Sequence, residues 1–168
     1  HGTLVLTNYE TSWYPVFHDI RALLANGQTL GQVRQIYVQA GHEGPVRIKL
    51  GPEFLAWLRD PARAGGGALF DFGCYGANLA TWWLGNRAPD HVWATMATYD
   101  PANYPACDDH AVIAMDYAGT SVTVVGSWHW TYARKDAAVF GESGAVVTND
   151  ERAHTVRSEE HTSELQSH

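Results

Sequence analysis

The sequence lacks any hydrophobic run long enough to cross a lipid bilayer. A spanning helix needs about 18 or more consecutive apolar residues, and the 168-residue sequence has no such stretch. The first residues also lack the basic start and apolar core of a secretion signal. We therefore expect no membrane contact and a cytoplasmic location. The chain begins at His1 without Met, which leaves the targeting of a longer gene product open.

Basic residues and cysteines are also scarce. The chain has 11 basic and 18 acidic residues and a formal net charge of −7, with no electrostatic footprint for DNA or RNA. Cys74 and Cys107 form no C-x-x-C pair and have no spacing typical of secreted disulfide proteins. We interpret them as buried or half-buried thiols. Nucleic-acid binding and a disulfide framework are therefore excluded.

Aromatic residues, by contrast, are abundant, with seven Trp and eight Tyr. Sugar-binding sites often use aromatic faces against the apolar side of sugar rings, although core packing accounts for most aromatic side chains in any domain. The composition therefore allows contact with a sugar without requiring it.

The first part of the chain predicts a strand, a helix and a second strand. Residues 3–7 (TLVLT) predict a short buried strand. A helix is expected to begin near Pro15, a residue favoured in the first turn, and to end at Gly27. Alternating side chains predict a strand over residues 32–39. This order is half of an α/β unit, and such a strand needs parallel neighbours that we do not find in this chain.

The remainder predicts helices followed by strands. A Gly- and Pro-rich loop precedes a short helix over residues 53–59, and a longer helix is expected over residues 68–84. Strands are then expected over residues 91–99, 110–117, 121–130, 137–140 and 145–148. Runs of strands after helices are typical of an α+β fold with a mostly antiparallel sheet.

The last residues, 158–168 (SEEHTSELQSH), differ in character from the rest. Leu165 is their single large apolar side chain, and the string resembles the translated read-through of a sequencing adapter. With so little to bury, the tail is expected to be disordered. We interpret it as non-native, with the natural sequence ending near Arg157.

Three glycines, Gly65, Gly66 and Gly67, stand directly before the longer helix. They allow close backbone approach and leave helix N–H groups available for a phosphate or carboxylate, but they also suit close packing alone. The run has neither G-x-G-x-x-G spacing nor the Lys of a P-loop, which argues against phosphate binding.

Asp71 and Tyr75 are four residues apart on the expected helix, so they share a face and can meet one ligand. Removing a hydride from an alcohol carbon also requires the hydroxyl proton to leave, and a carboxylate beside a phenol can handle that proton. Tyr has an ordinary pKa of about 10 and acts as a base at neutral pH only where a cation stabilises its phenolate. No Lys lies nearby in the sequence. The alternative is that Asp71 caps or pairs structurally and that Tyr75 packs in the core.

The stretch that contains both residues resembles a family signature. Residues 65–79, GGGALFDFGCYGANL, are similar to the G-G-G-x-L-x-D-x-G-x-H/Y-x-x-(D/N) pattern of the Gfo/Idh/MocA oxidoreductases. The resemblance implies that Asp71 and Tyr75 are catalytic, with Tyr75 as the acid/base group beside the substrate carbinol, and that Asn78 is the next polar residue of the site. Tyr75 in place of the commoner His indicates the branch resembling glucose-fructose oxidoreductase, and it leaves the catalytic pKa and the substrate class open.

The resemblance covers roughly residues 3–150 and implies a fold. We expect an open-faced, mostly antiparallel sheet packed on helices, similar to the C-terminal domain of glyceraldehyde-3-phosphate dehydrogenase. The expected parts are a strand–helix remnant of a Rossmann domain over residues 1–30, a substrate-binding and oligomerisation domain over residues 31–157, and the disordered tail over residues 158–168. The family's G-x-G-x-x-G fingerprint and Glu-Lys-Pro segment do not occur in the sequence. We therefore expect a truncated chain that is inactive by itself.

The resemblance also implies a cofactor and partners. These are NAD or NADP, a sugar or polyol substrate, and a homodimer or homotetramer formed through the open face of the sheet. Asn8 and Trp13 are the expected cofactor contacts, because they follow the segment similar to the last Rossmann strand. Packing of Trp13 on the adjoining helix is an equal alternative.

Three further side chains are expected to bind substrate: His42, Asn78 and His129. His42 lies in a Gly/Pro-rich loop that could aim it at the site, although a solvent-exposed loop His is the alternative. The pair Arg134–Lys135 could also reach a polyhydroxylated ligand with its donors.

Three functions remain open. The motif favours an oxidoreductase acting on a sugar, polyol or glycoside hydroxyl. A non-catalytic sugar-binding or assembly module with the same sheet is the second. The third is a metal-dependent hydrolase or isomerase using His42, Glu43 and Asp71, but these residues and His110 have no metal-ligand spacing, so we expect no metal.

Overall fold

The computed structural model describes residues 2–148, 153–158 and 162–166. Within these residues eight strands form one sheet in the order β2-β3-β4-β1-β5-β6-β7-β8. The strands are β1 (Val33–Gly41), β2 (His91–Ala97), β3 (His110–Tyr117), β4 (Thr120–Ser127), β5 (Arg134–Gly141), β6 (Gly144–Thr148), β7 (Ala153–Ser158) and β8 (Thr162–Gln166). Neighbouring strands are antiparallel, except that β1 and β4 run parallel. The expected α+β fold with a mostly antiparallel open sheet is confirmed.

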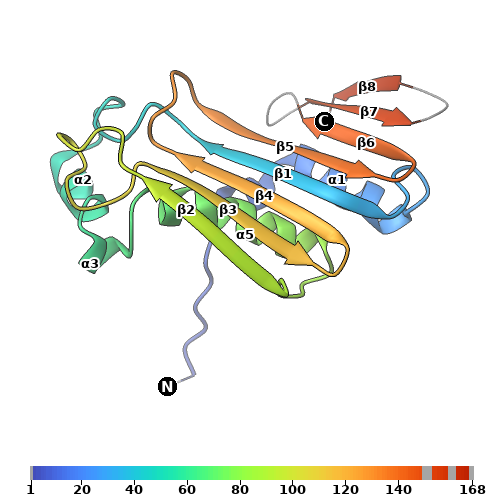
Figure 1. Ribbon diagram of the computed structural model, residues 1–168, viewed down its shortest axis with the longest axis horizontal. Helices are drawn as coiled ribbons and strands as arrows, with labels where there is room; N and C mark the ends of the chain where they lie inside the picture. Colours follow the sequence, from blue (N-terminus) through green and yellow to red (C-terminus); the bar gives the residue numbers. More distant parts are fainter. Residues whose placement is uncertain (1, 149–152, 159–161, 167–168) are drawn as a thin grey trace.

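Helices cover one face of this sheet and leave the other open. They are the 3-10 helix η1 (Glu10–Trp13) and the α-helices α1 (Pro15–Asn26), α2 (Pro52–Leu58), α3 (Pro61–Ala64), α4 (Ala68–Asp71) and α5 (Gly73–Trp83). In Figure 1, α1 and α5 lie behind the sheet, whereas α2 and α3 lie at one end of it. No helix in the described part of the chain has the length and hydrophobicity needed to span a bilayer.

The covered face of the sheet and the helices share one hydrophobic core. From Ile36 to Ala40 of β1 every second side chain is buried, as in a strand with one covered face. Val38 lies between Val124 of β4 and Ala137 of β5. Phe17 of α1 is fully buried in the same core, and its carbonyl oxygen accepts a hydrogen bond of 3.1 Å from the indole of Trp83. Helix α1, which the sequence assigns to a separate N-terminal part, therefore packs directly on the sheet.

Helix α1 has the expected ends. Pro15 is its first residue, and Gly27 follows it in the left-handed conformation with φ of 67°, where its backbone N–H bonds to Leu23. The predicted strands from residue 91 to residue 148 are also present, with bounds that differ by a few residues.

The expected strand over residues 3–7 is wrong. The structure has no strand there, and the side chains of Leu4, Val5 and Leu6 are about 80% exposed. A strand is stable only beside a partner that accepts its backbone hydrogen bonds, and no described strand pairs with this segment.

Two further expectations need correction. The sequence was expected to supply no parallel partner for its first strands. This is wrong for β1, because residues 35–41 of β1 pair in parallel with residues 121–127 of β4. The tail was expected to be disordered from residue 158, whereas Ser158 ends β7 and residues 162–166 form β8, paired antiparallel with β7. Backbone pairing at a sheet edge needs no large apolar side chains, which is why composition missed it.

The single helix expected over residues 68–84 is interrupted. Phe72, with φ of −112° and ψ of −31°, separates α4 from α5. Its side chain is 5% exposed and packs in a second core cluster with Trp128 and Tyr104. Asp71 and Tyr75 therefore lie on either side of a helix junction.

Candidate active site

Asp71 ends α4, where one indole holds its carboxylate. The Nε1 atom of Trp128, which follows β4 and is fully buried, donates a hydrogen bond of 2.8 Å to Asp71 Oδ2. Burial raises the pKa of Asp71, while the hydrogen bond from Trp128, the charge of His42 when its ring is protonated, and the charge of Lys135 oppose that rise. The carboxylate is thus fixed in orientation and readier than usual to take up a proton.

The glycines before α4 serve close packing. A Cβ on Gly67 would lie 1.8 Å from the carbonyl oxygen of Asp108, so only glycine fits there. The carboxylate of Asp108 accepts hydrogen bonds from the backbone N–H groups of Gly67 (3.0 Å) and Leu69 (2.7 Å). The chain's own carboxylate thus takes the place that an anionic ligand would need at this helix start.

Tyr75, in the first turn of α5, is half-buried at the edge of the second core cluster, 6.0 Å from the ring of Phe72. Burial raises the pKa of Tyr75 to about 12, and the neighbouring Cys74, Asp71 and Glu10 contribute in the same direction. At neutral pH its phenol is therefore protonated.

His42 lies beside this pair and is half-buried, not a solvent-exposed loop residue. Its ring packs edge-on against Phe72 at 4.9 Å, and its Nδ1 accepts a hydrogen bond of 2.8 Å from the backbone N–H of Gly44. Burial lowers the pKa of His42, although Asp71 and Glu43 oppose the change. The neutral ring then carries its proton on Nε2 and can donate it to a ligand.

Lys135 of β5 also reaches this site. Its Nζ lies 5.6 Å from the centre of the Tyr75 ring and forms an ion pair with Glu10 of η1. The sequence marked Lys135 only as a possible ligand contact and gave no sign of its link to Tyr75, 60 residues away. Strand register supplies that link, because Lys135 lies opposite Ala40 on β1, two residues before His42. Glu10 and Trp128 were not predicted at all.

Comparison with known proteins places the chain in a family. The model of the GFO/IDH/MocA C-terminal domain matches residues 17–147. This chain belongs to the Gfo/Idh/MocA family. The predicted resemblance is confirmed.

Two solved structures with the same fold are similar over nearly the whole chain. One is an inositol dehydrogenase homologue from Azotobacter vinelandii in complex with NAD+, with a TM-score of 0.80 and 20% identity, covering 95% of this chain and 42% of that one. The other is an aldose-aldose oxidoreductase from Caulobacter crescentus in complex with glycerol, with a TM-score of 0.80 and 21% identity, covering 99% and 48%.

A curated relative is the trans-1,2-dihydrobenzene-1,2-diol dehydrogenase of Xenopus tropicalis. It is 27% identical over 145 residues, which are 86% of this chain. The chain spans 40% of the length of that relative.

In this Gfo/Idh/MocA domain a second group of predicted site residues, Asn8, Trp13 and Asn78, lies around η1 and α5, apart from the Asp71–Tyr75 pair. Asn78 donates a hydrogen bond of 2.6 Å to the hydroxyl of Ser12, and the indole of Trp13 donates to the side-chain oxygen of Asn8. Trp13 and Asn78 line a cavity of about 360 Å³ together with His18 and Trp82. Trp13 is 72% exposed, so it does not pack in the core. Neither Asp71 nor Tyr75 lines this cavity.

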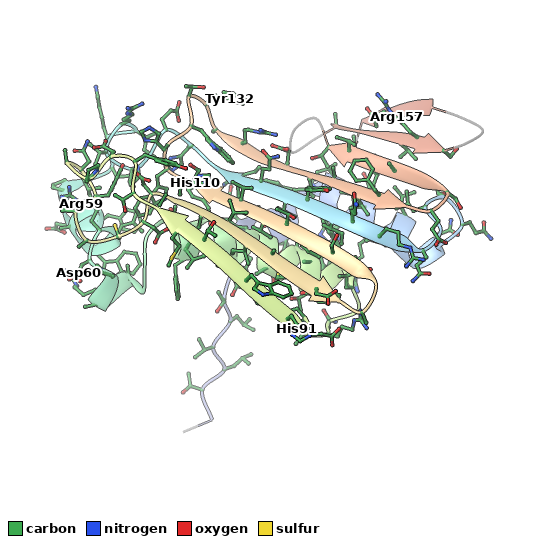
Figure 2. The ribbon with its side chains drawn as sticks, viewed as in Figure 1. Arg59, Asp60, His91, His110, Tyr132 and Arg157 are labelled. Carbon is green, nitrogen blue, oxygen red and sulfur yellow. The ribbon has the colours of Figure 1, made fainter. Side chains whose placement is uncertain are left out.

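The structure does not bring His129 to the Asp71–Tyr75 pair. His129 is exposed and lies 5.5 Å from the ring of Tyr99, which in turn lies 5.3 Å from His110. In Figure 2, His110 and Tyr132 lie at the end of the sheet that carries α2 and α3. The part of the chain that the structure describes contains no group of three or more His, Cys, Asp or Glu residues able to hold a metal ion.

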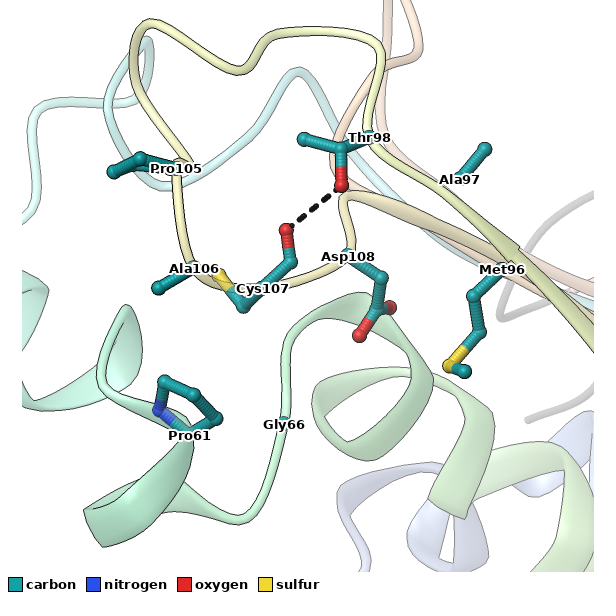
Figure 3. A pocket seen from close by; sticks show the side chains of 9 residues that line it. All are labelled: Pro61, Gly66, Met96, Ala97, Thr98, Pro105, Ala106, Cys107 and Asp108. Atoms are coloured by element: carbon teal, nitrogen blue, oxygen red, sulfur yellow. Dashed lines mark hydrogen bonds between the residues drawn. The ribbon is translucent and has the colours of Figure 1, made fainter.

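A second cavity, of about 440 Å³, lies between α3, the glycines before α4, the end of β2 and the loop that precedes β3 (Figure 3). Its polar side chains already have partners, because Thr98 donates to the carbonyl of Cys107 at 3.0 Å and the carboxylate of Asp108 accepts from the amides of Gly67 and Leu69 at the start of α4. None of the predicted site residues lines it. Cys107 is buried and Cys74 half-buried, and both are free thiols as expected.

Proposed function

We propose that this chain supplies the substrate side of an NAD(P)-dependent oxidoreductase, which moves a hydride between the nicotinamide and the carbinol carbon of a sugar, polyol or glycoside. The observation that carries the proposal is the meeting of Asp71, Tyr75, His42 and Lys135 at one helix junction. Family membership supports it, as do the dehydrogenase name of the curated relative and the NAD+ and glycerol of the two similar structures.

Tyr75 is the acid/base group in this proposal. When a carbonyl is reduced, the protonated phenol gives its proton to the carbonyl oxygen as the hydride reaches the carbon. When an alcohol is oxidised, the phenolate takes the hydroxyl proton as the hydride leaves. Burial keeps Tyr75 in the phenol form at neutral pH, with a pKa of about 12, so the residues of this chain favour the proton-donating role.

Asp71 and His42 orient the substrate. Asp71 accepts a hydrogen bond from a substrate hydroxyl while Trp128 holds its carboxylate at 2.8 Å. His42 donates from Nε2 to a substrate oxygen, since its Nδ1 already accepts from Gly44. A hydroxyl that both donates and accepts suits this pair, and this complementarity favours a polyhydroxylated ligand.

The residues present fit only part of the cofactor. The amides at Gly67 and Leu69 are bound by Asp108, so the glycine run cannot cradle a pyrophosphate, and we assign the phosphates to another part of the whole protein. Exposed Trp13 and Asn8, beside the cavity that Asn78 lines, are the proposed contacts on the nicotinamide side. When bound, the nicotinamide accepts or supplies the hydride at C4.

Replacement of Tyr75 by Phe in the whole protein tests this function. The Tyr75→Phe variant keeps the ring and loses the proton, so we expect turnover to fall by roughly 10² to 10⁴, measured as the change in reduced-nicotinamide absorbance with a panel of sugars and polyols. Tyr132→Phe, on a side chain that is 60% exposed, is the matched control and should leave turnover unchanged. Equal activity in Tyr75→Phe would rule out the assignment. Polyol binding without turnover in the unmodified protein would favour a non-catalytic sugar-binding module.

A further inference from the structure

Lys135 points to the helix-covered side of the sheet although its neighbours point away. Arg134 and Asp136 share the other face and bind each other through two hydrogen bonds of 2.8 Å. Lys135 lies on the same face as Ala137, which is buried in the core. The alternation of β5 thus sends one cation toward α5 and the Tyr75 ring.

Glu10 holds this cation in place. Its Oε2 accepts from Lys135 Nζ, and its Oε1 accepts from the hydroxyl of Tyr14 at 2.5 Å. Lys135 Nζ is also 3.5 Å from that hydroxyl. Burial opposes the charge of Glu10, yet the bonds from Lys135 and Tyr14 outweigh it and lower the pKa of Glu10. The carboxylate therefore stays charged and keeps the ammonium group beside Tyr75.

We infer that Lys135 is a positioning residue of this site: its ammonium group stabilises the Tyr75 phenolate, and the Glu10 carboxylate restrains and partly neutralises that ammonium group. The role of Lys135 in catalysis rests on the proposed function. The electrostatic interaction among Glu10, Lys135 and Tyr75 does not, because it can be measured in this chain without any reaction.

The charged groups around Tyr75 determine how easily its phenol ionises. Asp71 from α4, Cys74 from α5 and Glu10 from η1 all oppose the phenolate. Lys135 of β5 is the cation that faces these groups, with its Nζ 5.6 Å from the centre of the Tyr75 ring. Lys135 also lowers the pKa of His42 and of Asp71, so its positive charge acts on the neighbouring residues of the site. Neutralising Glu10 would act twice, since it removes one negative charge and leaves the charge of Lys135 uncompensated.

The chain itself allows a direct test by NMR. With tyrosine labelled at the ring carbon that bears the hydroxyl, the Tyr75 signal is assigned by its loss in Tyr75→Phe and titrated from about pH 8 to about pH 13. We expect Glu10→Gln to lower the Tyr75 midpoint by about 1 unit, because it removes a negative charge beside the phenolate. Lys135→Arg should also lower the midpoint, because arginine stays charged throughout this alkaline range whereas lysine does not, and Lys135→Met should titrate close to the parent chain. Glu142→Gln, which breaks the exposed ion pair with Arg34, is the matched control and should change nothing.

A Tyr75 midpoint in Glu10→Gln that coincides with the parent midpoint overturns the inference, and so does a Lys135→Arg variant that behaves like Lys135→Met. Glu10→Gln keeps the test decisive if Lys135→Met does not fold, because Gln can still accept the bond from Lys135.

Kinetics in the whole protein supply the second readout. We expect Lys135→Met to lower kcat/KM for alcohol oxidation about tenfold and to move the alkaline rise of the pH profile upward, while Lys135→Arg restores both. A purely structural role would lower activity without moving the pH profile and would overturn the inference. Full turnover in Tyr75→Phe would instead overturn the proposed function, whatever the NMR titration shows.

Discussion

At the scale of single residues, Asp71 lies where its charge is disfavoured. Burial raises the pKa of Asp71 because the folded protein solvates its carboxylate less well than water does. Above that pKa the charged carboxylate therefore lowers the stability of the folded state relative to the unfolded state. Function explains such a group, because acid/base sites depend on perturbed carboxylates. The hydrogen bond from Trp128 limits the penalty and fixes the side chain.

Asp71→Asn should therefore stabilise the fold while it removes activity. Asn keeps an acceptor for Trp128 and loses the buried charge, so we expect the free energy of unfolding at neutral pH to rise by on the order of 1 kcal/mol. The gain should vanish in acid, as Asp71 becomes protonated in the folded state. Urea denaturation at several pH values measures it. Asp90→Asn, on an exposed carboxylate, is the control, and a destabilised Asp71→Asn would contradict the argument.

The pKa of Tyr75 predicts opposite pH dependences for the two reaction directions. With a pKa of about 12, the phenolate fraction rises about tenfold per pH unit through the neutral and mildly alkaline range. We expect kcat/KM of the whole protein for alcohol oxidation to rise with that slope, and kcat/KM for carbonyl reduction, which uses the phenol, to stay level. Oxidation rates that reach a plateau near neutral pH would show that a group outside this chain controls Tyr75.

At the scale of secondary-structure elements, the alternation of side chains along the sequence predicted most strands but did not predict which strands pair with each other. Alternation along residues 110–117 and 121–130 is a local signal, and it located β3 and β4 well. Parallel pairing of β1 with β4 joins residues more than 80 positions apart, and no local signal specifies it. Residues 3–7 had the composition of a strand but lacked a neighbour within the described chain.

The candidate site was predictable where its residues share one motif, and at His42, which a Gly/Pro-rich loop singled out. Asp71, Tyr75 and Asn78 stand within eight residues, so helix spacing and family pattern found them together. The break at Phe72 has no such local signal, and it lies where the two helices touch the sheet, since a Cβ on Gly126 of β4 would lie 2.8 Å from the carbonyl oxygen of Ala68 and 3.0 Å from the backbone nitrogen of Gly73. Such close approach between distant segments is a tertiary effect that overrides helix spacing. The same holds for the meeting of Lys135 with Tyr75.

Helix α5 rests on the sheet through Gly76, which gives a test of this packing. A Cβ there would lie 2.3 Å from Val124 Cγ1, and Val124 is fully buried. Gly76→Ala should therefore destabilise the fold by about 1–3 kcal/mol, despite the better helix propensity of Ala. Urea unfolding followed by circular dichroism measures the loss. Gly51→Ala, at φ of −56° with open space around it, should change stability little. An unchanged midpoint in Gly76→Ala would refute the tight contact.

At the scale of the whole molecule, one face of the sheet carries a mixed apolar surface. A row of side chains crosses it from Trp93 through Ala114, Thr123 and Tyr37 to Ala138, as the strand register requires. Trp93 is 59% exposed, and Phe140, packed at 6.0 Å from Tyr37, is 39% exposed. Figure 2 shows side chains rising from this face with no helix over it.

Large aromatic side chains exposed together on an open sheet face are typical of a protein–protein interface. Two copies related by a two-fold axis can bury this face against itself, because the same row of residues then meets its own counterpart.

We therefore expect the whole protein to be a homodimer or a homotetramer through this sheet face, with a dimeric or larger mass by light scattering at micromolar concentration. Tyr37→Glu places a charge at the centre of the row and should weaken association about tenfold or more, since a buried unpaired charge is costly. Arg21→Glu on α1, which lies on the helix-covered side, is the matched control and should leave the mass unchanged. A monomeric mass for the unmodified protein, or one that Tyr37→Glu leaves intact, would remove the sheet face as the interface.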